Sequence, residues 1–372
     1  MIRVLNVSSD RNIGGAGRCI LNFLKYYDRE NFTVDVAVPK GSLLVPEIEK
    51  LGARVIEVDG IGDKSLDFGA IQELKRVIRE RDPQVVHTHG AMSGRIAGRQ
   101  CGKRVVYTRH SVFPVSKKLS RPPGKWINGF VNAHYADEIV AVAEAAKENL
   151  VESGVRADRV QVILNGVEAQ TRLSPEEIMA ERAKYGIAPE RFVAGILARM
   201  EHVKGHRYLL EAARMLKEEG KPVTVVIAGV GSLEDELKHQ AAEMGLGDTV
   251  IFAGFVTDVP RILSIMDIQL NASFGTEATS LALLEGMSMG IPAVVTDYGG
   301  NPGVISQGIN GLLVPTKNSV ALKEAISEIM ENKAAYTRMQ ASCLDVFQEK
   351  FTAEIYARNI EQVYRTAMGK RR

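Results

Sequence analysis

The sequence has few cysteines and no long apolar run. Its three cysteines, Cys19, Cys101 and Cys343, are scattered, without the Cys-x-x-Cys spacing of a zinc site or redox motif. This usage fits a reducing cytoplasm. No segment is long and apolar enough to span a membrane, and the apolar stretch at residues 1–7 is too short for a signal peptide. We therefore expect a cytoplasmic protein.

Acidic residues are missing from one long stretch. Between Pro83 and Ala136 there is no Asp or Glu, although the net charge of the whole chain is only +2. The same stretch contains nine basic residues, namely Arg95, Arg99, Lys103, Arg104, Arg109, Lys117, Lys118, Arg121 and Lys125. Such a basic face suits an anionic acceptor or an anionic membrane surface, where each cation contributes about 1 kcal/mol. Acids elsewhere in the fold that balance these charges explain the stretch equally well, and the overall charge indicates no nucleic-acid partner.

The 372 residues alternate between short apolar runs and amphipathic helical patterns. A first series of runs covers residues 4–7, 34–38, 55–58, 85–87, 105–108 and 139–142, and a second covers 192–196, 224–227, 250–252, 268–271, 293–296 and 311–314. Alternation of this kind predicts an α/β fold with parallel sheets covered by helices on both faces. Two such series predict two doubly wound, Rossmann-like domains.

The domain boundary is expected at a hinge over residues 165–168, before a polar helix that begins at Ser174 with a capping pattern. We predict an N-terminal domain over residues 1–165, a second domain over 166–350, and a C-terminal helix within 351–372. In open parallel sheets ligands bind at the carboxyl ends of the strands. The candidate site residues should therefore follow strands.

Two glutamates, Glu277 and Glu285, lie eight residues apart across an apolar run, with Glu277 in a loop and Glu285 near the start of a helix. A solvated surface pair is the plain alternative. The spacing resembles the Glu-x7-Glu signature of the family 4 retaining glycosyltransferases, which have the GT-B fold of two facing Rossmann-like domains with a cleft between them. That resemblance implies that Glu277 contacts the donor sugar and that Glu285 holds the ribose hydroxyls of the nucleotide. It also implies that the C-terminal helix crosses back to the first domain.

Two cations, Arg199 and Lys204, bracket a loop that leads into a helix at about Gly205. Cations at a helix start oppose its dipole, which favours a functional role in neutralising a diphosphate. The region resembles the family's Gly-x-Leu-x-x-x-Lys-Gly segment, whose Arg and Lys bind the donor diphosphate. Asp-x-Asp, which holds Mg²⁺ or Mn²⁺ in metal-dependent sugar transferases, is absent. We expect a metal-independent enzyme without a cofactor, in which these cations replace the metal.

Glycines mark two further candidate donor contacts. Gly14 and Gly15 lie in a Gly-rich turn that opens a helix, where bare amides can face an anion. Gly229 and Gly231 follow a strand, where the backbone could approach a ligand. Glycine is also the ordinary residue of any tight turn, so this signal is weak by itself.

The second domain supplies the remaining donor assignments. Phe255 and Val256 lie in a segment that resembles the nucleobase-binding segment of the family, although core packing explains Phe255 as well. Ser280 and Leu281, between the two signature glutamates, are assigned to the same donor site. The chain departs from the family at Gly303, where a Glu is usual, and this departure concerns the details of donor binding.

Histidines follow strands of the first domain. His110 ends a segment that resembles the family's Thr-x-His, which implies a position near the donor sugar, where it can hydrogen-bond a hydroxyl or stabilise the transition state. His87 and His89 point to the same face of a strand and could bind a metal if a carboxylate joined them. Since none lies beside them in the sequence, a buried or cleft-lining pair is favoured.

The resemblance predicts transfer of a hexosyl group from a nucleoside diphosphate sugar, with UDP as the expected nucleotide, to an acceptor hydroxyl with retention. Glu277 could be a covalent nucleophile on general grounds. The family's first Glu contacts hydroxyls away from the reactive face, which favours front-side attack assisted by the leaving phosphate. A nucleotide-sugar 2-epimerase and a non-catalytic nucleotide-sugar-binding subunit remain alternatives.

The sequence gives less information about the acceptor than about the donor. Residues 111–124 mix apolar and basic side chains, which suits a lipid-linked or membrane-surface acceptor in bacterial cell-surface polysaccharide or glycolipid biosynthesis; a disordered lid is the alternative. Expected partners are the nucleotide-sugar, an acceptor glycan or lipid-linked acceptor, and an anionic membrane surface to which the protein binds peripherally.

Overall fold

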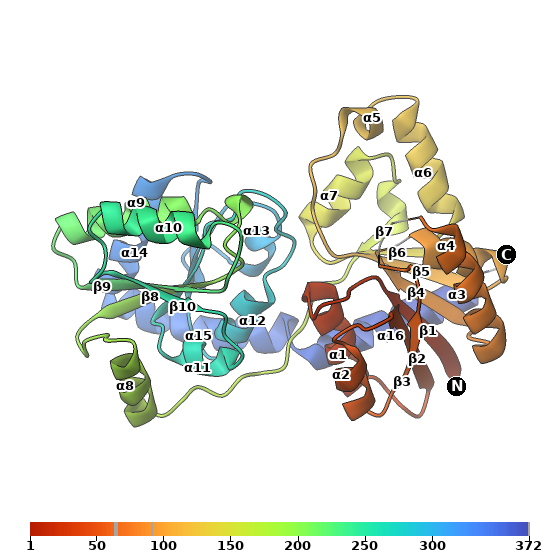
Figure 1. Ribbon diagram of the computed structural model, residues 1–372, viewed down its shortest axis with the longest axis horizontal. Helices are drawn as coiled ribbons and strands as arrows, with labels where there is room; N and C mark the ends of the chain where they lie inside the picture. The colour runs from red at the N-terminus through yellow and green to blue at the C-terminus, as the bar shows by residue number, and fades with distance from the viewer. Residues whose placement is uncertain (63–65, 91, 371–372) are drawn as a thin grey trace. The chain divides into compact units, whose positions relative to one another are not determined.

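The computed structural model describes residues 1–62, 66–90 and 92–370. The chain divides into two compact units (Figure 1). Unit 1 comprises Met1–Val167 and Phe351–Arg372, and unit 2 comprises Glu168–Lys350. Each unit is a parallel sheet with helices on both faces.

The sheet of unit 1 has the strand order β3-β2-β1-β4-β5-β6-β7, and all pairs are parallel. The strands are β1 (Ile2–Ser8), β2 (Phe32–Pro39), β3 (Arg54–Val58), β4 (Val85–His89), β5 (Arg104–Arg109), β6 (Glu138–Ala141) and β7 (Val160–Val162). In the centre of the sheet, Val4 pairs with Val34 on one side and Val85 on the other. Such central strands are apolar throughout because both faces are covered.

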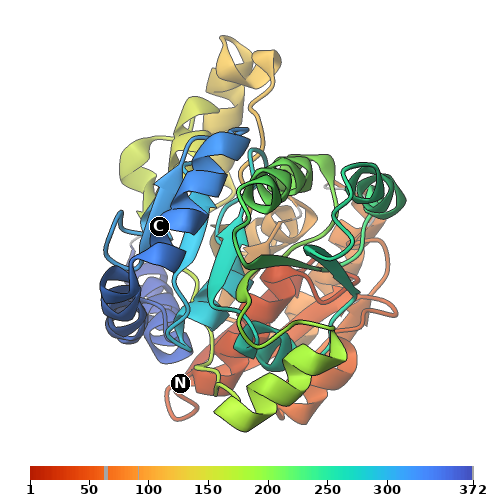
Figure 2. The ribbon, with the colours of Figure 1, turned by 90° about the vertical axis from the view of Figure 1, so that its left-hand side faces the viewer.

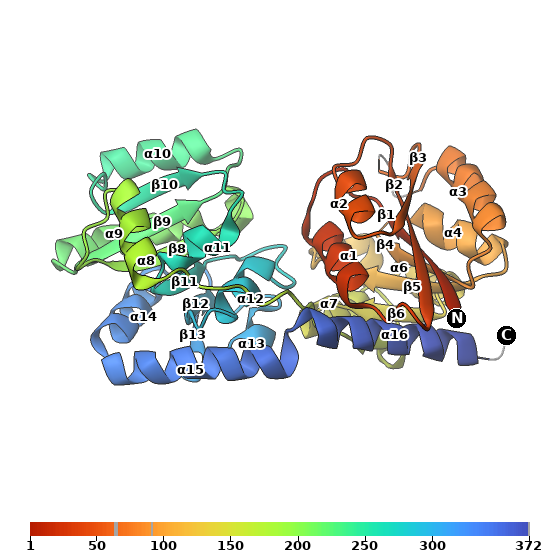
Figure 3. The ribbon, with the colours of Figure 1, turned by 90° about the horizontal axis from the view of Figure 1, so that it is seen from below.

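The helices of unit 1 are α1 (Gly15–Tyr26), α2 (Val45–Lys50), α3 (Phe68–Arg81), α4 (Met92–Gln100), α5 (Lys117–Ser120), α6 (Gly124–His134), α7 (Glu144–Glu152) and α16 (Ala353–Gly369), with a 3-10 turn η1 (Ala157–Arg159). One core cluster joins α3 and α4 to the sheet. Helix α16 packs beside α1 (Figure 3), where the rings of Phe23 and Tyr364 lie 5.8 Å apart. The last helix of the chain is therefore part of unit 1.

The sheet of unit 2 has the strand order β10-β9-β8-β11-β12-β13, again entirely parallel. Its strands are β8 (Phe192–Leu197), β9 (Val223–Ala228), β10 (Val250–Gly254), β11 (Ile268–Asn271), β12 (Ala293–Thr296) and β13 (Gly311–Val314). The order reverses direction next to β8, between β8 and β11. This is the switch point at which α/β sheets bind ligands.

The helices of unit 2 are α8 (Pro175–Lys184), α9 (His206–Glu218), α10 (Glu234–Glu243), α11 (Val259–Ser264), α12 (Leu281–Met287), α13 (Asn301–Val304), α14 (Ser319–Glu331) and α15 (Lys333–Lys350), with a 3-10 turn η2 (His202–Lys204). Helices α9, α10 and α14 share one core cluster, and α11 packs on the opposite face of the sheet. Figure 2 shows α9 and α10 (green) above the sheet and α8 (yellow-green) below it. The predicted cap of α8 is present, because Ser174 and Glu177 bond reciprocally.

The predicted α/β architecture is confirmed: each apolar run of both series forms a strand. Strand β7 was not predicted, since three residues are too few to show a period. Among the described residues, no helix combines the length and the apolar character needed to cross a membrane.

Candidate functional site

In unit 2, a cavity of about 200 Å³ lies at the carboxyl ends of β8 and β11. The predicted residues that line it are Arg199, Lys204, Glu277 and Ser280. The fold brings them together because Arg199 follows β8, whereas Glu277 and Ser280 follow β11. Arg199 and Glu277, which are 78 positions apart in the sequence, thus share one site. This is expected, because ligands of parallel sheets bind at the carboxyl ends of the strands.

Lys204 and Glu277 form a buried ion pair, with Lys204 Nζ 2.8 Å from Glu277 Oε2. The same oxygen accepts hydrogen bonds from Asn271 Nδ2 (3.3 Å) and Ser273 Oγ (2.9 Å). All three donors therefore converge on one carboxylate oxygen and fix its position. Sequence reasoning missed Asn271 and Ser273; the only signal was a polar side chain at the end of an apolar strand.

The backbone around Glu277 is also constrained. Thr276 adopts the left-handed region with a φ of 56°, which is unfavourable for a β-branched residue. Gly299, with a φ of 61°, packs so closely that an added Cβ would lie 2.0 Å from the Glu277 carbonyl oxygen. Gly300 donates its N–H to that oxygen (3.2 Å). Strain of this kind persists where surrounding contacts impose it, and here it orients a candidate functional carboxylate.

Lys204 is positioned by Gly205, which caps α9 with a φ of 74°. A Cβ on Gly205 would lie 2.1 Å from the carbonyl oxygen of Ala272, so glycine is required for this approach to β11. The helix predicted to begin at about Gly205 is confirmed. Arg199 differs from Lys204, because its side chain is largely exposed and pairs with Glu201 Oε1 at 2.7 Å. Its guanidinium is therefore accessible to a ligand.

Both signature glutamates are buried, Glu277 with 5% and Glu285 with 8% of its surface exposed. The alternative of a solvated surface pair is therefore wrong. Glu285 lies within α12, whose N-cap Ser280 accepts a hydrogen bond from the Leu283 N–H (3.4 Å). Leu281 is the first residue of that helix and is buried.

The glycines after β9 pack against the loop that contains Arg199. An added Cβ on Gly229 would lie 2.2 Å from the Ala198 carbonyl oxygen, and one on Gly231 would lie 2.4 Å from that of Met200. This close approach already requires glycine at both positions. Their contact with a donor stays a prediction.

The structure also shows the surroundings of three other residues of unit 2 that the sequence analysis named. Phe255 is 74% exposed, so the alternative of core packing is wrong for this residue. Val256 is half-buried against the cluster that includes α11. Gly303 has open space where its side chain would project. The Cβ of a Glu, the usual family residue at that position, would thus meet no neighbouring atom within 4 Å.

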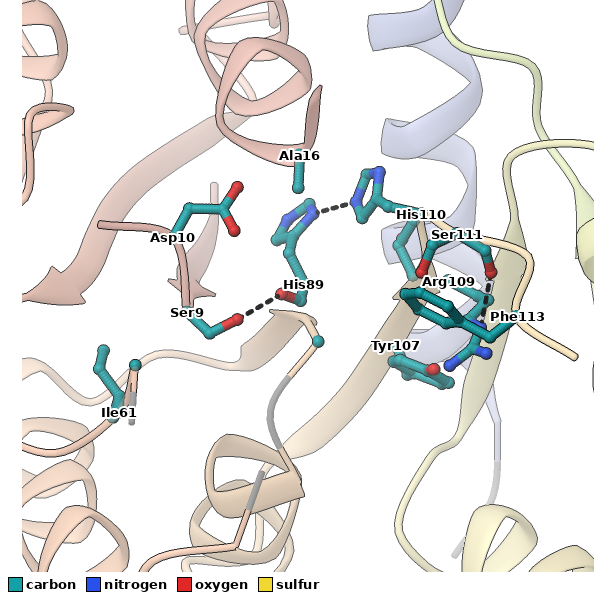
Figure 4. A pocket seen from close by; sticks show the side chains of 13 residues that line it. Ser9, Asp10, Ala16, Ile61, His89, Tyr107, Arg109, His110, Ser111 and Phe113 are labelled. Atoms are coloured by element: carbon teal, nitrogen blue, oxygen red, sulfur yellow. Dashed lines mark hydrogen bonds between the residues drawn. The ribbon is translucent and has the colours of Figure 1, made fainter. Parts of the chain in front are cut away.

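In unit 1, a cavity of about 380 Å³ contains His89 and His110 (Figure 4). His110 Nε2 lies 2.8 Å from His89 Nδ1, and His89 Nε2 donates to Asn6 Oδ1 (2.9 Å). A neutral His89 must then accept at Nδ1, which leaves His110 Nδ1 as a hydrogen-bond acceptor. Burial lowers the pKa of His110 to about 4, so its ring is neutral at pH 7.

The ring of His87 lies 4.2 Å from that of His89, but its hydrogen bonds go to other residues. Its Nδ1 is 2.8 Å from the Tyr364 hydroxyl, and its Nε2 is 2.7 Å from Thr108 Oγ1. Within the described ranges, no group of three His, Cys, Asp or Glu side chains could hold a metal ion. The buried pair of histidines matches the favoured interpretation of the His-x-His pattern.

Asp10 is a cavity residue that sequence reasoning missed. Its Oδ2 accepts a hydrogen bond from the Gly17 N–H (3.2 Å) in the first turn of α1, and burial raises its pKa. The chain thus supplies a carboxylate at the turn formed by Gly14 and Gly15, where a ligand anion was expected. Their donor contact stays a prediction.

The acid-free stretch divides into two parts. Arg99 and Arg104 pair with Asp137, and Lys103 pairs with Asp82, so acids outside the stretch balance these charges. Across the part of the chain that the structure describes, no ion pair involves the four cations Lys117, Lys118, Arg121 and Lys125 at α5 and α6. The exposed part of the basic face that no acid balances therefore lies at α5 and α6.

Comparison with known proteins places the chain among sugar transferases. Residues 13–171 match the model of Glycosyltransferase Family 4, and residues 177–342 match that of Glycosyl transferases group 1. The chain is 27% identical over 324 residues to the putative glycosyltransferase EpsD of Bacillus subtilis, which covers 83% of each protein. It is 27% identical over 279 residues to the UDP-Gal:alpha-D-GlcNAc-diphosphoundecaprenol alpha-1,3-galactosyltransferase of Escherichia coli, covering 72% of this chain and 71% of that protein.

Solved structures share the fold. A glycosyltransferase from Rickettsia africae superposes with a TM-score of 0.86 at 22% identity, over 100% of this chain and 99% of that one. Anabaena HepE in complex with UDP superposes with a TM-score of 0.84 at 21% identity, over 98% and 100%. The two parallel α/β units of this chain therefore form the GT-B fold, as in HepE.

Proposed function

Since the chain belongs to the family 4 (group 1) glycosyltransferases, we propose that it moves a hexosyl group from a UDP-sugar to an acceptor hydroxyl with retention of configuration. The observation that carries this proposal is the buried Lys204–Glu277 pair in the cavity of unit 2. The pair supports the proposal because a cation able to neutralise a diphosphate lies beside a fixed carboxylate able to accept from a sugar hydroxyl. The choice of UDP is supported by the HepE complex and by the donor named for the Escherichia coli relative.

Each residue has a proposed role in donor binding. Arg199 and Lys204 stabilise the diphosphate, and Oε1 of Glu277, the oxygen to which none of the three bonds described above goes, accepts from a sugar hydroxyl. Glu285 binds the ribose hydroxyls, with Ser280 and Leu281 beside it. Phe255 and Val256 face the nucleobase, and exposed Phe255 is available to stack on it.

The proposed chemistry is a front-side displacement. The acceptor oxygen forms a bond to the anomeric carbon on the face from which UDP departs. The bond between that carbon and the β-phosphate oxygen breaks, its electron pair stays on the phosphate, and the acceptor proton moves to the same phosphate oxygen. The products are the glycoside and UDP. Arg199 and Lys204 stabilise the charge that develops on the leaving diphosphate, so no metal ion is needed.

We place the acceptor in the cavity of unit 1, where neutral His110 offers Nδ1 to a sugar hydroxyl. An acceptor at a membrane surface is supported by α6, whose Trp126, Ile127 and Phe130 are exposed. The unpaired cations of α5 and α6 lie in the same segment, and an exposed apolar face with flanking cations is typical of helices that lie on anionic membranes. This supports a peripheral location at the cytoplasmic face, in cell-surface polysaccharide or glycolipid synthesis.

The test is a donor screen with UDP-, GDP-, ADP- and dTDP-sugars in EDTA, read by thermal shift and by mass spectrometry of the products. We expect stabilisation by the UDP-sugars alone, and loss of that stabilisation in Glu285→Ala. An epimerase would change the sugar without an acceptor, and a binding subunit would leave the donor intact. Absence of nucleotide binding, or binding that requires a divalent metal, would overturn the proposal.

A further inference from the structure

A second cavity of unit 1, of about 370 Å³, borders the cavity that contains His110. The two share Gly90, Tyr107, Arg109 and Phe113 as lining residues. Figure 4 shows Tyr107, Arg109 and Phe113 grouped beyond His110, on the side away from Asp10. A ligand with one group near His110 can therefore extend another into the second cavity.

The second cavity is lined by two arginines and no carboxylate. Its polar lining consists of Arg95, Arg109, Asn128, Asn132, Asn149, Ser116, Ser153 and Tyr107. Across the described ranges, no Asp or Glu forms an ion pair with Arg95 or Arg109. This is unlike Arg99 and Arg104 of the same acid-free stretch, which pair with Asp137.

Arg95 is a buried cation held only by neutral groups. It is 3% exposed, its guanidinium lies 4.3 Å from the centre of the Tyr107 ring, and its Nη2 donates to Asn132 Oδ1 (3.0 Å). Burial lowers its pKa to about 10, so it is still charged at pH 7. A buried charge without an opposite charge is costly, and a bound anion would offset that cost.

Neutral groups also hold the guanidinium of Arg109 in position. Its Nε donates to the Ser111 carbonyl oxygen (2.8 Å) and its Nη2 to Asn149 Oδ1 (3.1 Å), while Phe113 stacks at 5.4 Å. The asparagine amides are themselves engaged, since Asn149 Nδ2 donates to the Phe113 carbonyl oxygen. The asparagines therefore orient the guanidinium groups without cancelling their charge.

We propose that this cavity binds a phosphate or diphosphate group of the acceptor, with Arg95 and Arg109 as its cations, while the acceptor hydroxyl lies beside His110. The inference rests on the proposed glycosyl transfer and specifies its acceptor as a phosphorylated molecule. Guanidinium groups suit this ligand because their planar donors match phosphate oxygens in pairs. The volume is within the range of small-molecule sites.

The test is calorimetric titration of inorganic pyrophosphate into the full chain saturated with UDP, so that the donor diphosphate site is already occupied. We expect one binding site, at least about 10-fold weaker in Arg109→Gln because a charged phosphate contact is lost. Arg79→Gln, an exposed arginine on α3 outside the cavity, is the matched control and should bind as wild type. Equal binding by Arg109→Gln and wild type would overturn the assignment.

A second pair of variants tests the same site independently, in case Arg109→Gln does not fold. Ser116 lines the cavity as the N-cap of α5, a position that Asp and Asn suit equally. Ser116→Asp and Ser116→Asn differ only in charge, so weaker pyrophosphate binding in the Asp variant alone supports an anion site. Indistinguishable binding by the two variants contradicts it.

Two further measurements complete the test. One distinguishes a lipid-linked phosphate from a soluble one, and the other distinguishes failure of the phosphate site from failure of the proposed function. A short prenyl diphosphate that binds more tightly than a hexose 1-phosphate assigns a lipid-linked acceptor, and the reverse order assigns a soluble one; either supports the site. UDP binding is measured first on each sample. A wild type that binds UDP but not pyrophosphate refutes the phosphate site alone, whereas one that does not bind UDP refutes the proposed function.

Discussion

Lys204 Nζ lies 2.8 Å from Glu277 Oε2, at the carboxyl ends of strands β8 and β11 in unit 2. The pair joins two segments that the sequence presents as separate motifs. The cation proposed for the diphosphate and the carboxylate proposed for the sugar thus hold one another in position. Pre-organisation of this kind reduces the reorganisation needed at the moment of reaction.

Glu277→Gln should lower kcat by about 100-fold or more while the affinity for UDP changes little, because a pre-organised charged contact to the reacting sugar is lost and the diphosphate contacts are kept. Initial rates of UDP release and calorimetric titration with UDP measure the two quantities. Glu328→Gln, on α14, serves as the matched control. Equal kcat for Glu277→Gln and wild type would be incompatible with the proposed role.

Lys204→Met should destabilise the fold by about 3 kcal/mol, since it leaves the Glu277 carboxylate buried without its cation. Adding Glu277→Leu should restore much of that loss, because both charges are then absent. Urea unfolding of the two single variants and the double variant gives the coupling free energy. Additive losses would show that the two groups do not interact.

Glu285→Gln should weaken UDP binding by about 10-fold, because a charged acceptor for the ribose hydroxyls becomes a neutral one. Binding of uracil alone should change little. Competition titrations with UDP and uracil distinguish loss of the ribose contact from a general disturbance of unit 2, which would weaken both ligands together.

The free energy of unfolding should fall as the pH drops below about 6.5. Burial lowers the folded-state pKa of His206 and His110 to about 4 and of His87 to about 3. Their stabilising contribution is therefore complete above the unfolded pKa and is lost as the pH falls toward the folded pKa, at about 1.4 kcal/mol per pH unit for each histidine.

His206 provides the sharpest variant for this pH dependence. Both of its ring nitrogens are buried without a hydrogen-bond partner. His206→Leu should therefore reduce the slope between pH 6.5 and 4.5 and be more stable than wild type at pH 5. Urea unfolding at several pH values measures it, with the exposed His239→Gln as background. An unchanged slope in His206→Leu would show that this ring does not stay neutral in the fold.

Much of the fold and the centre of the site follow from local sequence patterns. Strands such as residues 224–227 are short apolar runs between helices, and Lys204 and Glu277 belong to motifs with fixed spacing. Asn271, Ser273 and Asp10 could not be predicted in the same way. Their roles depend on which segments the sheet places side by side, and a lone polar residue after a strand does not contain that information.

Burial was the other property that the sequence did not determine. The acid-free stretch shows nine cations of the same kind, yet Arg95 is buried without a counter-charge, Arg99 pairs with Asp137, and Lys117 is exposed. Phe255 shows the reverse case, an aromatic residue that the fold leaves at the surface. Composition gives the number of such residues, but tertiary packing decides which of them are buried, paired or exposed.

The most direct test is calorimetric titration of UDP in EDTA against wild type, Arg199→Gln and Arg214→Gln. Arg199 is largely exposed, so its loss should not disturb folding, and partly exposed Arg214 on α9, outside the cavity, is the control. We predict metal-free binding of one UDP, weakened at least about 10-fold in Arg199→Gln and unchanged in Arg214→Gln. Binding that appears only with Mg²⁺ or Mn²⁺, or equal affinity for Arg199→Gln and wild type, would contradict a diphosphate site built from protein cations.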